Sequence, residues 1–231
     1  MAGSDQMTEV PATNDASAAP GVVSLEPEDR LRADTYRVLG RLLATPPDAE
    51  TLGLFAGAPV SNEDNLLAVA WRMLAMSAER TTPEQAADEY QALFIGLGRG
   101  ELVPFGSWYL TGFLMEQPLA KLRSDMLRLG FERQEEVSEP EDHAAALCEI
   151  MALLAMDDDP RSLASQAEFF ENHIGPWMAR FFRDMQEASS ARFYRAVGQL
   201  GEHFINTDQR YLEMVERSDD ATADPVRPGI S

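Results

Sequence analysis

Apolar residues recur at helical spacing along most of this chain, and this periodicity constrains its fold more than any other feature. The first stripe joins Leu31, Val38, Leu39 and Leu42, and it ends before Pro46. Steps of three and four residues place such side chains on one face of an α-helix. Similar stripes follow. The sequence shows no convincing alternation of apolar and polar residues at every second position, which is the pattern of a β-strand. The sequence therefore predicts an all-α fold of roughly nine to eleven helices.

Capping residues, prolines and glycines set the expected helix boundaries. Thr82-Pro83-Glu84-Gln85 combines an N-cap, a proline at the first helical position and a capping box. Gly130 is expected to stop the helix that begins at Pro118. Further starts are expected at Ser61, Ser138, Asp159, Gly175 and about residue 191, the last helix running to about residue 215. Segments 55–60, 96–106 and 131–137 lack a helical pattern, and such loops often carry function.

The two ends of the chain differ in composition from its body. Residues 1–24 are rich in Ala, Ser, Thr, Pro, Gly and Asp, and residues 218–231 look the same. Such segments cannot bury enough apolar surface to offset the entropy of ordering. We therefore expect disordered tails at 1–24 and 218–231 around one all-α domain at 25–217.

Charge and cysteine content limit the classes of partner. The 231 residues carry a formal net charge of −20, which makes a nucleic acid partner unlikely because phosphate binding needs clustered Lys and Arg. The single cysteine, Cys148, lies in an apolar helical stretch, so we expect a buried structural thiol. The sequence shows neither a secretory signal nor an apolar run near the length of a membrane span, so we expect a cytoplasmic protein without stable membrane insertion.

Metal and catalytic motifs are not supported by the sequence. The residues three positions before His143, His173 and His203 are not glutamates, so paired Glu-x-x-His ligands are missing, and one cysteine cannot build a zinc cluster. The glycines at 96–100 are not followed by the Lys-Ser/Thr of a phosphate loop. Asp142 is adjacent to His143, and neighbouring helical residues do not face each other. We therefore expect a binding module that is not an enzyme and holds no metal or cofactor.

Ionisable residues are unusually dense at one expected helix start. Ser138 is expected to be the N-cap, with Glu141 closing a capping box three residues later. Helix capping does not account for Glu139, Asp142 and His143. These residues are either a solvated helix end or a site for a cationic ligand.

Three segments resemble motifs of a known family. They read Glu139-Pro140-Glu141-Asp142-His143, Tyr90-Gln91-Ala92-Leu93-Phe94-Ile95-Gly96-Leu97-Gly98 and Pro104-Phe105-Gly106-Ser107-Trp108-Tyr109-Leu110. In order and spacing they are similar to the Glu-Pro-x-Asp-His, Tyr-x-x-Leu-Phe-x-Gly-Pro-Gly and Pro-x-x-Ser-x-Tyr motifs of TorD/DmsD chaperones, the redox-enzyme maturation proteins. The resemblance covers about residues 28–215. Two positions depart from the family motifs. Leu97 stands where the family often has proline, and Glu149 is the one acidic residue kept from the acidic run that often follows the motif histidine, here His143.

The resemblance implies a cytoplasmic, non-enzymatic chaperone with a TorD-like helical bundle, monomeric or homodimeric. Such chaperones bind the twin-arginine signal peptide, or the apo form, of a molybdopterin-dependent oxidoreductase catalytic subunit and delay its export until the molybdenum cofactor is inserted. A family-like helix-start pattern at 172–182 favours formate dehydrogenase among the possible clients. A generic helical adaptor and a nucleotide-binding protein without a recognisable nucleotide motif are the alternatives.

The resemblance also implies a signal-peptide site. An acidic rim of Glu139, Glu141 and Asp142, with His143 beside it, is expected to take the arginines through charge-assisted hydrogen bonds. An apolar groove of Phe105, Ser107, Trp108 and Tyr109 is expected to take the peptide's apolar core. Trp108 fits a place in the hydrophobic core equally well. Asp142 likewise fits a purely structural role as a group at a helix terminus. The motif residues expected to act structurally are Tyr90, Leu93, Phe94, Gly96, Gly98, Pro140 and Glu149.

Overall fold

A computed structural model describes residues 27–59, 61–97, 99–131, 140–157, 159 and 162–222, with side chains described to residue 215. This part of the chain contains ten α-helices, one π-helical turn and no β-strand, which confirms the all-α prediction. The helices are α1 (Pro27–Ala44), α2 (Ala49–Ala56), α3 (Leu66–Glu79), α4 (Pro83–Tyr90), the π-helical turn η1 (Gln91–Ile95), α5 (Gly106–Thr111), α6 (Gln117–Arg128), α7 (Ala144–Ala155), α8 (Ser162–His173), α9 (Met178–Glu187) and α10 (Phe193–Thr222). The expected tail at 1–24 lies outside the described residues.

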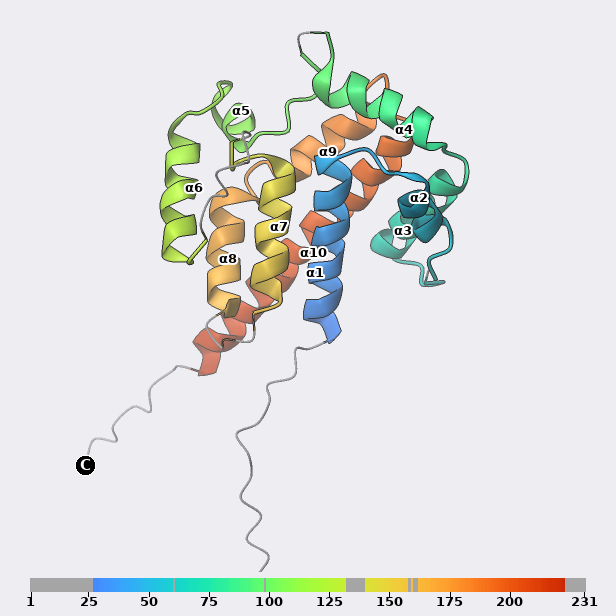
Figure 1. Ribbon diagram of the computed structural model, residues 1–231. Helices are drawn as coiled ribbons and strands as arrows, with labels where there is room; N and C mark the ends of the chain where they lie inside the picture. The colour runs from blue at the N-terminus through green and yellow to red at the C-terminus, as the bar shows by residue number, and fades with distance from the viewer. Residues whose placement is uncertain are drawn as a thin grey trace, which may run out of the picture.

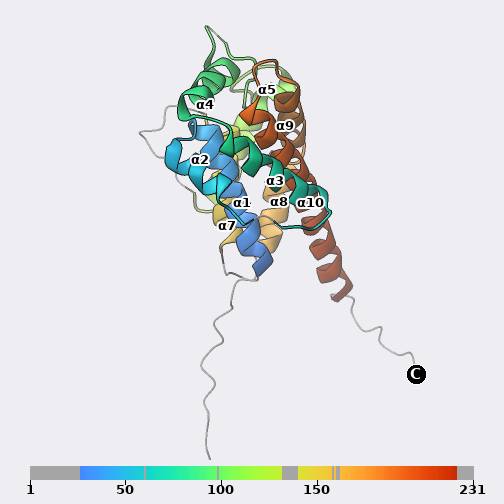
Figure 2. The same ribbon diagram turned by 90° about the vertical axis from the view of Figure 1, so that its right-hand side faces the viewer.

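Helices α1, α7, α8 and α10 form the centre of the molecule. Helix α1 packs along α7, α7 packs on α8, and the long α10 contacts α9, α3 and α8 (Figure 1). Helices α5 and α6 lie on one side of this centre, whereas α2, α3 and α4 lie on the other (Figures 1 and 2). The two sides therefore present separate surfaces.

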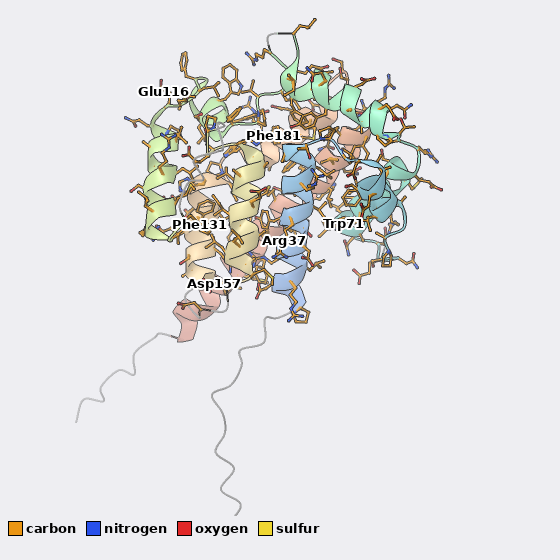
Figure 3. All side chains as sticks on the ribbon, in the orientation of Figure 1. Arg37, Trp71, Glu116, Phe131, Asp157 and Phe181 are labelled. Atoms are coloured by element: carbon orange, nitrogen blue, oxygen red, sulfur yellow. The ribbon has the colours of Figure 1, made fainter. Side chains whose placement is uncertain are left out.

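Aromatic side chains fill the space where α9 packs against α10. Phe181 and Phe182 of α9 are fully buried, and Figure 3 labels Phe181 in the upper middle of the molecule. Trp177, just before α9, is 2% exposed and packs against Tyr109 of α5, with ring centroids 5.3 Å apart. A large apolar side chain contributes about 1.5–3 kcal/mol when it is fully buried. Gly201 allows α10 to approach closely, because a Cβ atom there would lie 2.4 Å from the Phe182 ring.

A buried polar cluster joins α1 to α10. The Asp208 carboxylate accepts hydrogen bonds from the Arg32 guanidinium and from the Tyr36 hydroxyl, the latter at 2.7 Å. Gln166 on α8 accepts a second Arg32 hydrogen bond at 2.8 Å. Because every charged group in this cluster has a partner, the cluster avoids the cost of an unpaired buried charge.

Several expected boundaries are confirmed. The Thr82 side chain and the Gln85 side chain form a reciprocal capping box at the start of α4. Gly130 has a φ of +81° just after α6 ends. Cys148 is fully buried, and burial raises the pKa of its thiol. Local signals of this kind act within one helix turn, so they can be recognised without the rest of the fold.

Other expected boundaries are wrong or shifted. Helix α3 begins at Leu66 rather than at Ser61, because the Asn65 side chain caps it by accepting from the backbone N–H of Ala68 at 2.8 Å. Helices α2 and α5 have only eight and six residues and were not anticipated. Helix α10 extends to Thr222, so its last residues fall within the range 218–231 expected to be a tail.

The prediction that a helix begins at Ser138 is also wrong. Ser138 lies outside the described residues, and α7 begins at Ala144 with His143 as its N-cap. The His143 Nδ1 atom accepts from the backbone N–H of Ala145 at 3.1 Å. Glu141 therefore does not close a capping box, because the Glu141 carboxylate binds another helix instead.

Candidate functional site

Two of the sequence motifs are held together by backbone hydrogen bonds. The N–H of Gly106 donates to the Asp142 carbonyl at 2.9 Å, and the N–H of Ala144 donates to the Pro104 carbonyl at 2.8 Å. Phe105 and His143 form an isolated antiparallel β-bridge, and their rings meet edge to face with centroids 5.0 Å apart. The structure thus brings the start of α5 against the start of α7.

Asp142 has one satisfied and one unsatisfied carboxylate oxygen. Its Oδ2 atom accepts from the backbone N–H of Ser107 at 2.7 Å. Its Oδ1 atom is buried and has no hydrogen-bond partner among the described residues, and the residue is 3% exposed. A buried carboxylate oxygen without a partner is costly, and such atoms often mark a place where a ligand supplies the missing donor.

Glu141 is occupied by an ion pair. Both oxygens of its carboxylate accept from the Arg123 guanidinium of α6, at 2.9–3.1 Å. Glu141 is 8% exposed, and its hydrogen bonds raise the pKa of Arg123. The pair ties α6 to the segment before α7, so Glu141 positions this part of the molecule. Glu139, the remaining residue of the expected rim, lies outside the described residues.

A cavity of about 350 Å³ lies between α5, α6, α7 and α8. Asp142 and Ser107 line it together with apolar groups that include Leu122, Leu147 and Trp177. The cavity also contains two cationic or titratable side chains that already have partners. These are Lys121, which donates to Asn172 at 2.7 Å, and His173, which lies 2.8 Å from Asp125. Asp142 is therefore the cavity group with an unmet hydrogen-bonding requirement.

Four large apolar side chains are exposed beside this cavity. Leu110 is 42% exposed, Phe113 68%, Leu114 47% and Met115 69%. They belong to the end of α5 and the turn before α6, and Figure 3 labels Glu116 where this segment meets α6. They were not among the residues expected at the site, although the run Leu110-Thr111-Gly112-Phe113-Leu114-Met115 could have indicated an exposed apolar turn.

Trp108 and Tyr109 lie at a second cavity of about 560 Å³, also lined by residues of α9. The Arg99 guanidinium lies over the Trp108 ring, 4.3 Å from its centroid. The Tyr109 hydroxyl donates to Asp184 at 2.9 Å, and burial together with this carboxylate raises the pKa of Tyr109. The expected groove residues are therefore divided, because Ser107 lines the first cavity and Trp108 and Tyr109 line the second.

The upstream motif forms part of the core. Leu93 is fully buried, the Tyr90 hydroxyl donates to the carbonyls of Leu43 and Ala44 at 3.1 and 2.9 Å, and Phe94 packs against Tyr194. Gly96 has a φ of +63°, and a Cβ atom there would lie 2.1 Å from the Arg99 carbonyl oxygen, so this turn requires glycine. Gly98 lies outside the described residues. Pro140 accepts from the His143 N–H at 3.1 Å, and Glu149 is exposed on α7.

Neither a metal cluster nor a membrane span is found in the part of the chain that the structure describes. Within the described ranges, no group of three or more His, Cys, Asp or Glu side chains is arranged to hold a metal ion. None of the helices in those ranges combines the length and apolar character required to cross a membrane.

The fold and the site define an all-α protein in which Asp142 lines a cavity between α5, α6, α7 and α8. The model of the nitrate reductase delta subunit family matches residues 61–183, which are 123 of the 231 residues. The chain therefore belongs to this family, which includes the TorD and DmsD chaperones of redox-enzyme maturation.

Individual relatives agree with this assignment. The chain is 25% identical to the chaperone protein TorD of Shewanella piezotolerans over 80% of this chain and 94% of the relative. It is 28% identical to the Tat proofreading chaperone DmsD of Salmonella typhimurium over 73% of this chain and 84% of the relative. A crystal structure of a redox enzyme maturation protein from Archaeoglobus fulgidus aligns with 86% of this chain and 99% of its own length, and its TM-score of 0.44 and identity of 15% are too low to add support to the assignment. Because the curated relatives are chaperones, they support a chaperone role.

Proposed function

We propose that this chain binds the twin-arginine signal peptide of a molybdopterin-dependent oxidoreductase subunit in the cytoplasm. It holds the subunit back from export until the molybdenum cofactor is inserted, and it catalyses no reaction itself. The observation that carries this proposal is the buried Asp142 Oδ1 atom, which has no partner and belongs to a residue that lines an otherwise largely apolar cavity.

The chemistry of a signal peptide matches this site. Its arginines carry planar guanidinium groups with several N–H donors, and these groups form strong, directional hydrogen bonds with carboxylates. An arginine that enters the cavity supplies the donor that Asp142 Oδ1 lacks. The complex then contains a paired buried carboxylate instead of an unpaired one, so part of the binding free energy comes from removing this cost.

The apolar core of the signal peptide needs a different surface. The exposed segment formed by Leu110, Phe113, Leu114 and Met115 lies next to the cavity and offers apolar area that water now covers. Burial of apolar area contributes about 25 cal/mol per Å², so covering this segment favours binding. We assign the apolar core of the peptide to this segment.

The structure supports different roles for the residues of the expected rim and groove. Ser107 fixes the Asp142 carboxylate, and Glu141 holds α6 in place through Arg123. Trp108 and Tyr109 line the second cavity and are assigned to a separate part of the surface. Asp142 is therefore the residue that we assign to the arginine contact.

A calorimetric titration tests the proposal. The full chain is titrated with a synthetic twin-arginine signal peptide of a molybdopterin oxidoreductase and with a copy in which both arginines are alanine. We expect micromolar binding of the first, about 8 kcal/mol, and at least tenfold weaker binding of the copy. Equal binding of both peptides would indicate a general helical adaptor, and failure of the native peptide to bind would reject the proposal.

A further inference from the structure

A groove of about 800 Å³ is lined by residues of α3, of α4 and of the start of α10. These elements lie on the side of the molecule away from α5 and α6 (Figure 1). Helix α3 contributes Met73, Met76 and Ser77 to its wall, and Arg80, the residue that follows this helix, extends the same wall. These positions are spaced by three and four residues, so they form one face of the helix. Helix α4 likewise contributes positions of one face, which are Gln85, Asp88 and Glu89, so the groove is lined by one face of each helix.

Apolar side chains are exposed in this wall. Met73 is 44% exposed and Met76 47%, whereas Leu74 between them is fully buried in the core. The face that carries the two methionines is therefore left uncovered by the rest of the described chain. Methionine side chains are flexible and polarisable, and they are common on surfaces that adapt to apolar partners.

The groove also gathers positive charge on a strongly acidic chain. Arg80, Arg192 and Arg195 line it and are exposed. Within the described residues, the guanidinium groups of Arg80 and Arg192 have neither an ion pair nor a hydrogen bond. The carboxylates of Asp88 and Glu89 also line the groove, so the three arginines leave it a formal excess of one positive charge. The net charge of the whole chain is −20, so the sign of this local charge is opposite to the overall charge. Such an inversion favours an acidic partner at this place.

Glu89 does not neutralise these arginines. Its carboxylate is 7% exposed and accepts from the backbone N–H groups of Arg192, Phe193 and Tyr194 at 2.6–3.0 Å, so it is used to cap the start of α10. The same contacts occupy the N–H groups that a phosphate would use at a helix start. The geometry therefore favours a ligand whose carboxylates bind the arginine side chains, and it disfavours a phosphate ligand.

We propose that this groove binds an amphipathic helical segment of a partner protein whose polar face is acidic. The apolar face of the segment covers Met73 and Met76, and its carboxylates bind Arg80 and Arg192 through paired N–H donors. This occupant has the charge opposite to that of a signal peptide, so the two sites select different segments. Together with the signal-peptide site, on whose proposal this statement rests, the groove lets the chain hold a basic and an acidic segment on two sides of the centre formed by α1, α7, α8 and α10.

Two synthetic helices provide the probes. One has leucine on one face and glutamate on the other, and the second replaces every glutamate by lysine. We expect the glutamate peptide to bind the full chain and the lysine peptide to bind at least tenfold more weakly. The variant Arg80→Glu/Arg192→Glu should lose at least tenfold in affinity for the glutamate peptide. The control Arg30→Glu/Arg210→Glu changes the net charge equally at exposed positions outside the groove and should retain the wild-type affinity.

Methyl NMR of the methionines locates the contact. The glutamate peptide should shift the Met73 and Met76 methyl signals and leave that of Met115, which lies beside the other cavity, unchanged. Failure of the glutamate peptide to bind, equal loss of affinity in the control variant, or a shift at Met115 alone would overturn the proposal. Displacement of the bound peptide by a nucleoside triphosphate would assign the groove to a phosphate ligand and would also overturn it.

Discussion

The Asp142 carboxylate accepts a hydrogen bond from the backbone N–H of Ser107 at 2.7 Å and leaves its second oxygen buried without a partner. This contact joins two motifs that are separated by 35 residues in the sequence. It fixes the direction of the carboxylate. The Asp142–Ser107 contact is therefore both a structural link and the origin of the proposed recognition site.

Replacement of Asp142 by asparagine separates these two roles. The asparagine side-chain oxygen can still accept from the Ser107 N–H, so Asp142→Asn should retain the fold. The change removes the negative charge, and affinity for a twin-arginine peptide should fall at least tenfold, about 1.4 kcal/mol. Glu149→Gln removes the same charge from an exposed position of α7 and serves as the control in calorimetry. A large loss of stability in Asp142→Asn with unchanged affinity would place Asp142 in the structure alone.

Glu141→Gln should show the opposite pattern. The Glu141 carboxylate binds Arg123 through both oxygens, and an amide cannot reproduce this charged pair. The Arg123 side chain is half exposed, so we expect a loss of only about 1 kcal/mol in the free energy of unfolding. Urea denaturation measures this loss, and peptide affinity should change less than in Asp142→Asn. A tenfold loss of affinity at unchanged stability would assign Glu141 to the ligand.

The close approach of α10 to α9 depends on Gly201. Gly201→Ala places a methyl group 2.4 Å from atoms of the buried Phe182 ring, so the variant should be destabilised by about 1–3 kcal/mol. A methyl group added at Gly53 in α2 would meet no atom within 4 Å, so Gly53→Ala should be neutral or more stable by up to about 1 kcal/mol. Thermal and urea unfolding of both variants check the pair. Equal stability of the two would contradict this close packing of α10 on Phe182.

Stability should also depend on the protonation of His173. Burial lowers the pKa of His173, although its hydrogen bond with Asp125 acts in the opposite direction. The folded state then binds fewer protons than the unfolded state, in which the pKa is about 6.5, so stability is lost as the pH falls through and below this value. Urea midpoints measured from about pH 7.5 to pH 5.5 should fall more steeply for the wild type than for His173→Gln. Equal slopes for the two proteins would contradict the prediction.

The sequence predicts the fold class because helix signals are local. The Thr82 capping box and Gly130 each act within a few residues and are found at their expected places. The stripe from Leu31 to Leu42 lies in α1 as expected, although Leu31 itself is 60% exposed. The start of α7 was predicted wrongly, because Glu141 is held by Arg123 on another helix. Long-range partners of this kind leave no periodic pattern in the sequence.

The candidate site could be predicted only in part. The two motifs that meet at Asp142 and Ser107 can be recognised in the sequence, but their backbone hydrogen bonds cannot. The burial of Asp142 Oδ1 and the exposure of Phe113 and Met115 depend on how α5 and α6 pack. The division of Ser107 from Trp108 onto different cavities follows from the direction of a six-residue helix that the sequence did not indicate.

A double-mutant cycle between Asp142 and the peptide arginines tests the central claim most directly. Calorimetry gives the binding free energies of the wild type and Asp142→Asn for the twin-arginine peptide and for its twin-alanine copy. If an arginine binds the Asp142 carboxylate, the two changes should be coupled by about 1.5 kcal/mol or more. Coupling below about 0.5 kcal/mol means that the changes act independently, and this result would contradict the arginine contact at Asp142.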